Sequence, residues 1–331
     1  MTAAHVTDGN SHHQDWPDAR RGGDARGVST QVSAERGLRE PWPGREITSG
    51  GVTLHVRETP GPDGIPAVYV HGLSGSATNW TDLAGLLSGR ATGTAVDLPG
   101  FGHSRPLATP DWSPDGHADA LMCFLAGRGE RVHLLGNSLG GALSISVAAR
   151  RPELVASLTL VSPAMPDRRP DPRRIADPRL ALAMVPVLGR RAKAQIAELT
   201  ATERARQTIR LCFGDPGVVP PHRLAQAVAE LEARAGLPWA RQAVMGTAGQ
   251  MIASWALGGL WRQAARVQAP TLVVWGGLDR LVSPRLAART AATIPGARLL
   301  MLPGVGHVAQ MEAPEAVAEA VAELWEDPAA V

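Results

Sequence analysis

Short, mostly apolar runs alternate with stretches of helical pattern over most of the chain. The runs occupy residues 67–70, 94–97, 132–135, 154–161, 271–276 and 297–302. Apolar runs of this length are typical of strands that are buried on both faces, as in a parallel sheet. Stretches with helical spacing lie between them, at residues 79–87, 116–126, 142–150 and 314–325. This order predicts an α/β fold with a mostly parallel central sheet flanked by helices.

Three segments depart from this alternation. Residues 1–43 are polar and Gly-rich without apolar periodicity, which predicts a disordered N-terminal tail. Residues 52–56 alternate between apolar and polar side chains, as expected of an antiparallel strand at the edge of the sheet. Between 162 and 267 the pattern is helical only, over far more residues than a connection needs.

The long helical segment predicts a helical cap at 164–260, inserted between two parts of a core at 44–163 and 261–331. Its helices are predicted at 179–184, 193–199, 202–212, 221–235 and 238–257.

The composition of the chain argues against several classes of function. The chain has 331 residues, 44% of them hydrophobic, and a net charge of +2, which argues against nucleic acid as the main partner. We find no signal peptide and no apolar stretch of membrane-spanning length, so we expect no stable membrane insertion. Cys123 and Cys212 show neither metal spacing nor a disulfide framework, and Cys123 is expected in the core. A reducing, cytoplasmic location follows, while the oligomeric state stays open.

Ser138 is the candidate nucleophile. It lies in the hexapeptide Gly-Asn-Ser-Leu-Gly-Gly at 136–141, between an apolar run and a helical stretch. A G-x-S-x-G sequence at a strand-to-helix turn is typical of a nucleophile elbow. The glycines at 136 and 140 avoid clashes in that tight turn, and the Leu139 N–H can face a developing oxyanion.

A serine nucleophile needs a histidine base and an acid that orients the histidine. Asp279 follows the apolar run at 271–276, and His307 follows the run at 297–302. Both lie just past the carboxyl end of a predicted strand, where open α/β sheets place their sites. Ser138, Asp279 and His307 therefore appear in the chain order that this kind of fold requires. Asp167, after the run at 154–161, is the rival for the acid.

These motifs, with His71-Gly72 and the stretch Asp-Leu-Pro-Gly-Phe-Gly-His-Ser at 97–104, resemble those of the α/β-hydrolases from about residue 45 onward. The resemblance implies that fold, with an inserted helical cap. It also implies a triad of nucleophile, acid and base at Ser138, Asp279 and His307. Its oxyanion donors would be the N–H groups of Leu139 and Leu73, with Ser74 as an alternative to Leu73.

Other polar residues near these motifs are expected to brace the site. His71 is expected to support the oxyanion loop, because His307 already occupies the base position. Asp97 and His103 are expected to hold loops by hydrogen bonds.

The resemblance implies a serine hydrolase that acts on a small-molecule ester or related acyl substrate, with neither metal nor organic cofactor. The candidates for substrate binding are Ser74, Asn137, Val308 and Trp255. The Gly-Asn-Ser sequence and the cap also resemble the meta-cleavage C–C hydrolases, so cleavage of a vinylogous diketone is the alternative. Those enzymes have a Trp where this chain has Val308, which favours the ester. A ligand receptor on the same fold is a third hypothesis.

Overall fold

The computed structural model describes residues 40–167, 199–255 and 258–326, which belong to one of the chain's two units, Leu38–Val331. The predicted tail at 1–43 lies outside the described residues apart from residues 40–43. The helices predicted at 179–184 and 193–199 also lie outside them, apart from Leu199.

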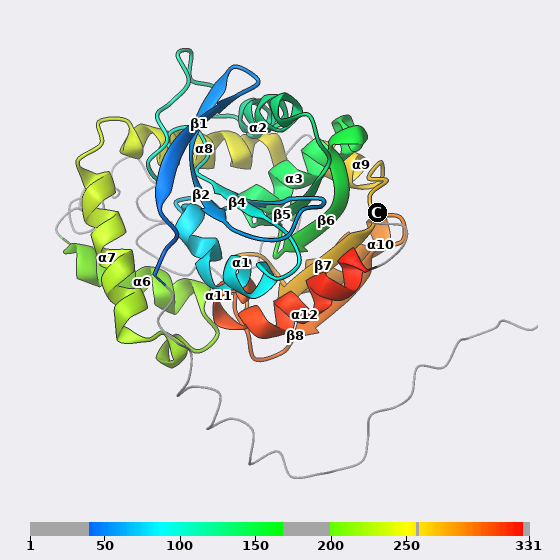
Figure 1. Cartoon of the computed structure of the whole chain (residues 1–331). Coiled ribbons are helices and arrows are strands. Elements are labelled where there is room, and N and C mark those ends of the chain that lie inside the picture. Colours follow the sequence, from blue (N-terminus) through cyan, green and yellow to red (C-terminus); the bar gives the residue numbers. More distant parts are fainter. Residues whose placement is uncertain (1–39, 168–198, 256–257, 327–331) are drawn as a thin grey trace, which may run out of the picture. The chain divides into compact units, whose positions relative to one another are not determined.

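A sheet of eight strands runs through the described residues in the order β1-β2-β4-β3-β5-β6-β7-β8 (Figure 1). β1 pairs antiparallel with β2, and β2 pairs antiparallel with β4, whereas every other neighbouring pair is parallel. The mostly parallel sheet predicted from the apolar runs is confirmed. The strands are β1 (Gly44–Ser49), β2 (Val52–Thr59), β3 (Ala67–Val70), β4 (Gly93–Val96), β5 (Val132–Asn137), β6 (Val155–Val161), β7 (Thr271–Gly276) and β8 (Arg298–Leu302).

Helices cover both faces of the sheet, because successive side chains of a strand point to opposite faces. Val68 and Val70 of β3 join one apolar cluster with side chains of α2, α3 and α10. Ala67 and Tyr69 of the same strand join a second cluster with α1 and α12. The helices are α1 (Thr81–Leu87), α2 (Pro114–Arg128), α3 (Leu139–Arg150), α10 (Arg285–Thr293), α11 (Ala309–Glu312) and α12 (Pro314–Trp325), with short 3₁₀ turns at Ala77–Trp80 and Pro152–Leu154.

Two sequence predictions were wrong. The strand predicted as the edge is β2, which lies inside the sheet, and β1 forms the edge instead. Cys123 was expected in the core, yet its side chain is exposed on α2. Its neighbours on either side, Met122 and Phe124, are buried. Residue 123 therefore lies on the solvent side of α2, between two residues of its buried face.

Four described helices connect β6 to β7: α6 (Ala201–Cys212), α7 (Pro221–Ala235), α8 (Ala240–Trp255) and α9 (Gly259–Ala264), with a 3₁₀ turn at Pro216–Val218. They fall largely in the range predicted as a cap. The boundaries of the last three predicted cap helices differ from α6, α7 and α8 by at most two residues. The division of the chain into tail, core and cap stays a prediction.

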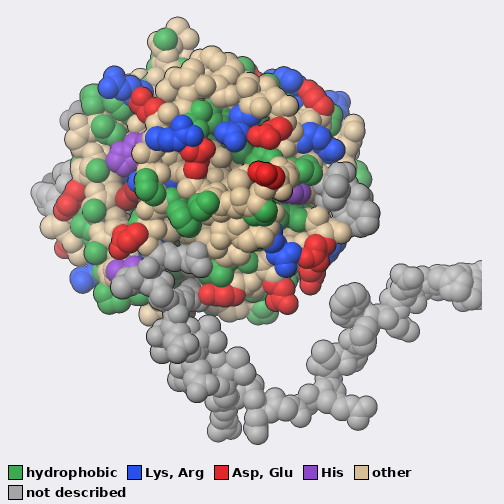
Figure 2. All heavy atoms as spheres, viewed as in Figure 1, with side chains coloured by type: hydrophobic (Ala, Val, Ile, Leu, Met, Phe, Trp, Pro, Cys, Tyr) green, Lys and Arg blue, Asp and Glu red, His purple; other side chains and the backbone are tan. Residues whose placement is uncertain are grey.

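Charges on the surface do not segregate on the face drawn in Figure 2, where Arg side chains are interspersed with Asp and Glu side chains. No helix within the described ranges combines the length and the apolar character that a bilayer span would require.

One buried histidine connects α2 to α8. The Nε2 of His117 lies 3.0 Å from Thr247 Oγ1, and its Nδ1 has no hydrogen-bond partner among the described residues. Burial, followed by the proximity of His71, lowers the pKa of His117 to about 4. The folded protein therefore holds this ring neutral over a pH range in which an exposed histidine is protonated.

We expect the protein to lose stability as the pH falls from 6.5 towards 4. The unfolded chain binds a proton at residue 117 in this window and the folded chain does not, so this residue alone lowers the free energy of unfolding by about 2 kcal/mol between pH 7 and pH 5. The check is urea unfolding at both pH values for the wild type and for His117→Gln. The variant should show a drop smaller by that amount. Equal drops would contradict the assignment.

Candidate active site

Ser138 occupies a strained turn between β5 and α3. Its backbone angles are φ 53° and ψ −115°, a backbone conformation that residues other than glycine rarely adopt. The Ser138 N–H donates to Val161 O at 3.0 Å. A Cβ at Gly140 would lie 2.2 Å from Val70 O, so the turn requires a glycine there. The Ser138 side chain does not cap α3, which leaves its hydroxyl available to a base.

Asp279 and His307 form a buried pair past the ends of β7 and β8. His307 Nδ1 lies 2.8 Å from Asp279 Oδ2, and the two side chains are 3% and 0% exposed. Asp279 Oδ1 accepts the N–H groups of Leu281 and Val282 at 2.8 and 2.9 Å. A carboxylate that accepts from Nδ1–H leaves Nε2 of a neutral imidazole as a proton acceptor. The pair is therefore suited to general-base chemistry. Asp167, the rival acid, instead pairs with Arg285 at 2.6 Å.

Asn137 ties the serine turn to the histidine loop. Its Nδ2 donates to His307 O and to Val161 O, both at 3.1 Å. An amide nitrogen has two hydrogens, so both are used and none is left for a substrate. The amide group of Asn137 therefore positions the backbone of His307, and the predicted contact of Asn137 with a substrate stays a prediction.

The loop after β3 lies against Ser138. A Cβ at Gly72 would come within 3.1 Å of Ser138 Cβ, so Leu73 follows a residue in close contact with the serine. His71 braces this loop from inside, as expected from the sequence. Its Nδ1 lies 2.7 Å from Gly72 O, and its Nε2 accepts the N–H of Leu98 at 3.0 Å. Burial lowers the pKa of His71, which favours the neutral ring that this pair of bonds requires.

The N–H groups of Leu139 and Leu73 are the two candidate oxyanion donors. Leu139 is the first residue of α3, where helix geometry leaves N–H groups without an intrahelical acceptor. It directly follows Ser138, and the Gly72 contact brings Leu73 to the same place.

Asp97 holds two loops, as predicted. Its Oδ1 accepts Ala77 N–H at 2.6 Å, and its Oδ2 accepts His103 N–H and the His55 ring, both at 2.8 Å. Burial would raise the pKa of Asp97, but the bond from His55 and the other interactions outweigh it and lower the pKa. His103 contributes its backbone N–H to this network, with its side chain exposed.

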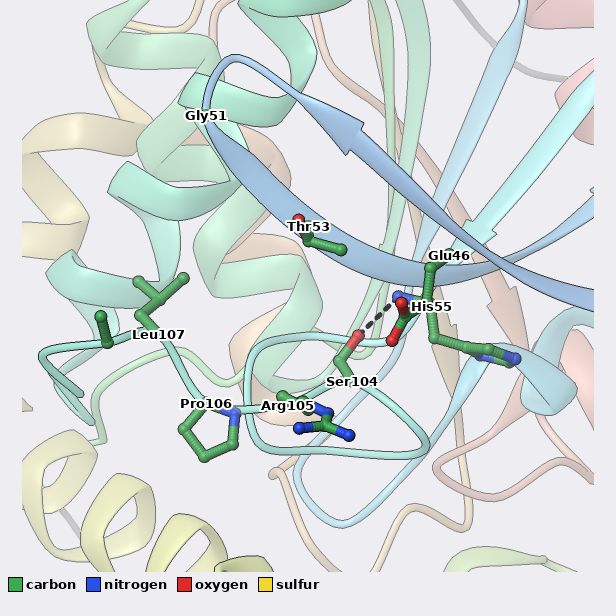
Figure 3. A pocket seen from close by; sticks show the side chains of 9 residues that line it. Glu46, Gly51, Thr53, His55, Ser104, Arg105, Pro106 and Leu107 are labelled. Carbon is green, nitrogen blue, oxygen red and sulfur yellow. Dashed lines mark hydrogen bonds between the residues drawn. The ribbon is translucent and has the colours of Figure 1, made fainter.

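Beside this network lies a pocket of about 390 Å³ between the β1–β2 hairpin and the loop at 104–108 (Figure 3). His55 and Ser104 meet there through a bond from His55 N–H to Ser104 Oγ at 2.8 Å. The pocket is lined by Glu46, Gly51, Thr53, His55, Ser104, Arg105, Pro106, Leu107 and Ala108. None of Ser138, Asp279 and His307 lines it.

The remaining predicted substrate residues lie on three different elements. Ser74 is exposed in the loop after β3, Val308 is 7% exposed at the start of α11, and Trp255 is half-buried at the end of α8. Their contact with a substrate stays a prediction. Among the described residues, no group of three or more His, Cys, Asp or Glu side chains is arranged to bind a metal ion.

Sequence reasoning missed Glu312, which fixes the histidine loop. The Glu312 carboxylate is 8% exposed and accepts three backbone N–H groups: Gly306 at 2.7 Å, Gly214 at 3.0 Å and Asp215 at 2.9 Å. A buried carboxylate with several N–H donors is a strong anchor. The only signal for it was a single acid in the otherwise uncharged stretch between His307 and Pro314.

Arg280 was also missed. Its Nη1 donates to Arg210 O and Phe213 O, both at 2.7 Å, and His307 N–H donates to Cys212 O at 2.6 Å. The end of α6 is thus bonded to residues next to Asp279 and to His307 itself. Burial of the Cys212 thiol, followed by the charge of Asp279, raises its pKa to about 12, so this cysteine is not a competing nucleophile at neutral pH.

Known proteins resemble this chain over most of its length. The chain is 31% identical over 273 residues to the dihydrolipoyllysine-residue acetyltransferase component of an acetoin cleaving system from Pseudomonas putida, covering 81% of this chain and 65% of that protein. It is 26% identical over 274 residues to Lipase 3 of a Moraxella species, covering 76% of this chain and 74% of the lipase.

Among solved structures, a 2-hydroxy-6-oxo-6-phenylhexa-2,4-dienoate hydrolase from a Rhodococcus strain superposes with a TM-score of 0.69 at 23% identity, over 86% of this chain and 99% of that one. At this identity the likeness shows the fold alone. The family model described as the alpha/beta hydrolase fold matches residues 66–314. With that match over most of its length, the chain belongs to the α/β-hydrolase fold family.

Proposed function

We propose that this protein is a serine hydrolase that cleaves a carboxylic ester, or a related acyl bond, of a small apolar substrate. The observation that carries the proposal is the buried bond between His307 Nδ1 and Asp279 Oδ2 at 2.8 Å. Asn137, the residue before Ser138, is bonded to the backbone of the same histidine. The candidate base, its orienting acid and a strained serine therefore all follow the carboxyl ends of strands of one sheet.

The reaction begins when Ser138 Oγ attacks the substrate carbonyl carbon and His307 Nε2 takes the hydroxyl proton. Asp279 holds the ring in the correct tautomer and stabilises the imidazolium. The N–H groups of Leu139 and Leu73 bind the oxyanion of the tetrahedral intermediate. The intermediate collapses as the proton passes from His307 to the leaving alcohol, which leaves an acyl-enzyme on Ser138. Water, deprotonated by His307, then attacks the acyl carbon, and the acid leaves as His307 returns the proton to Ser138 Oγ.

Three features support an ester rather than a C–C substrate. Val308, which follows the base, is apolar and buried. Met251 and Leu260, on the late helices of the predicted cap, are partly buried and pack on the apolar core. One relative reported above is a lipase. An apolar residue beside the base suits an acyl chain, whereas a dienoate needs polar groups around its conjugated acid. The chemistry requires no cofactor, and a cytoplasmic location remains part of the proposal.

We expect ester hydrolysis to exceed C–C hydrolysis. The test compares kcat/KM for a medium-chain p-nitrophenyl ester and for a 2-hydroxy-6-oxo-dienoate on one preparation, with Ser138→Ala as the blank. We expect kcat/KM to be at least tenfold higher for the ester, a difference of about 1.4 kcal/mol in transition-state stabilisation. A dienoate preference of tenfold would replace the ester with the C–C reaction. Tight ligand binding without turnover of either substrate would instead favour a receptor.

A further inference from the structure

Helix α7, in the predicted cap, carries a row of polar contacts to the loop after β3 and to α1. Residues 223, 230 and 234 are spaced by seven and four, which puts them on one face of the helix. Arg223 Nη2 lies 2.5 Å from Asp82 Oδ1 on α1. Glu230 Oε2 accepts Ser76 Oγ–H at 2.8 Å. Arg234 Nη1 donates to Ser74 O at 2.6 Å and, more weakly, to Gly75 O at 3.3 Å.

The contact made by Arg234 falls on the part of the loop that the core does not brace. The start of the loop is held by His71, through Gly72 O. Its end is held by Asp97, through Ala77 N–H. Between them, Ser74 adopts a left-handed backbone conformation with φ 61°, which is unfavourable for a residue with a side chain. The Arg234 guanidinium fixes the carbonyl of this strained residue.

Because peptide groups are planar, the bond from Arg234 to Ser74 O also constrains the orientation of the Leu73 N–H. Ser74 C=O and Gly75 N–H belong to one planar trans peptide and point in opposite directions. With Ser74 O held by Arg234, Gly75 N–H donates to Gly72 O at 3.0 Å. Gly72 C=O in turn shares a planar peptide with Leu73 N–H. Two rigid planes and one hydrogen bond therefore connect Arg234 to the direction of Leu73 N–H, next to Ser138.

We propose that Arg234 is a positioning residue for the oxyanion hole, which acts from α7 by fixing the Ser74–Gly75 peptide and through it the Leu73 N–H. The inference rests on the proposed function, because it takes Leu73 as an oxyanion donor. Glu230 supports the same loop one residue further along, at Ser76. The contacts of α7 with this loop then contribute to the catalytic machinery.

The experiment compares Arg234→Gln with Arg223→Gln. Both remove one guanidinium from the docking face of α7. Among the described residues, the Arg223 guanidinium bonds to Asp82 and Gln226 and to no residue of the loop at 72–76. The readouts are kcat and KM for p-nitrophenyl butyrate and the inhibition constant of an alkyl trifluoromethyl ketone, whose hemiketal oxyanion imitates the transition state.

Loss of one oxyanion donor costs on the order of 10²–10³ in kcat, and a misdirected donor costs part of that. Arg234→Gln should lower kcat by roughly tenfold or more, leave KM within about twofold, and weaken the trifluoromethyl ketone by the same factor as kcat. Arg223→Gln should change kcat and the inhibition constant by less than about twofold. Arg234→Lys keeps the charge and one donor, and should recover part of the loss.

A purely structural role would move the melting temperature without moving the inhibition constant in step with kcat. The inference is wrong if Arg234→Gln keeps the wild-type kcat and the wild-type inhibition constant. It is also wrong if Arg223→Gln lowers kcat as much as Arg234→Gln does. If Arg234→Gln fails to fold, Arg234→Lys decides: wild-type kcat and wild-type inhibition would overturn the proposal. A wild type that hydrolyses no ester counts against the proposed function, whereas an active wild type with an unaffected Arg234→Gln counts against this inference alone.

Discussion

Replacing Ser138 with alanine is expected to lower kcat for a p-nitrophenyl ester by on the order of 10⁴-fold or more. The members of a triad act as a unit, so removing one of them abolishes most of the rate enhancement of all three. In the proposed reaction the Ser138 Oγ attacks the carbonyl, and alanine offers no nucleophile in its place. The folded state should be nearly unaffected, since alanine keeps the Cβ and the Ser138 side chain makes no cap to α3. The measurements are steady-state kinetics and the melting temperature.

Ser146→Ala is the matched control, about two turns further along α3. Its hydroxyl donates to Gln263 Oε1 at 2.7 Å, so the change removes a serine hydroxyl from the same helix at a site away from the proposed chemistry. It should cost some stability and leave kcat within about twofold. Residual activity of Ser138→Ala comparable to that of the control would contradict the assignment.

Asp279→Asn is expected to lower kcat by on the order of 10⁴-fold, by analogy with other triads. The amide that replaces the carboxylate presents an N–H where His307 needs an acceptor, so the ring turns to the wrong tautomer. The two backbone bonds to Leu281 and Val282 can still be made by the Asn carbonyl oxygen, which keeps the loop in place. Kinetics at neutral pH, with the melting temperature measured alongside, checks the effect.

The control for this change is Asp167→Asn, which removes the carboxylate that the sequence left as a rival. Asp167 pairs with Arg285 in a partly exposed ion pair, with 23% and 45% of the two side chains exposed. Such pairs contribute about 1 kcal/mol or less to stability, so kcat should stay within about twofold. A severe loss in Asp167→Asn with a mild effect of Asp279→Asn would reverse the assignment.

The parts of the fold that the sequence predicted well are those set by local pattern. The run before Ser138 and the stretch after it became β5 and α3, because continuous apolar residues and helical spacing act within a few residues of each other. The short loops after β7 and β8 bring Asp279 and His307 to the end of the sheet where Ser138 lies. β1 was missed because its six residues are mostly polar or charged and half-buried at best; backbone bonding to β2 holds it.

The contacts that the sequence did not predict join residues far apart in the chain. Arg234 and Ser74 are 160 residues apart, and Gly214 and Glu312 are 98 apart. No periodicity or spacing connects such pairs, because they depend on how the helices between β6 and β7 pack on the core. The bond from Asn137 to the backbone of His307 was not predicted for a related reason, because it depends on the position of His307 O in the folded chain.

Covalent labelling tests the central claim, that Ser138 is the nucleophile, most directly. The protein is treated with an alkyl fluorophosphonate and digested with trypsin, and the adduct is located by tandem mass spectrometry. The peptide at 132–150 contains three serines, at 138, 144 and 146, so the fragment ions must distinguish them. We expect a single adduct on Ser138 at a stoichiometry near one, loss of esterase activity in step with labelling, and no labelling of Ser138→Ala. An adduct on any other residue, or undiminished labelling of Ser138→Ala, would contradict the account.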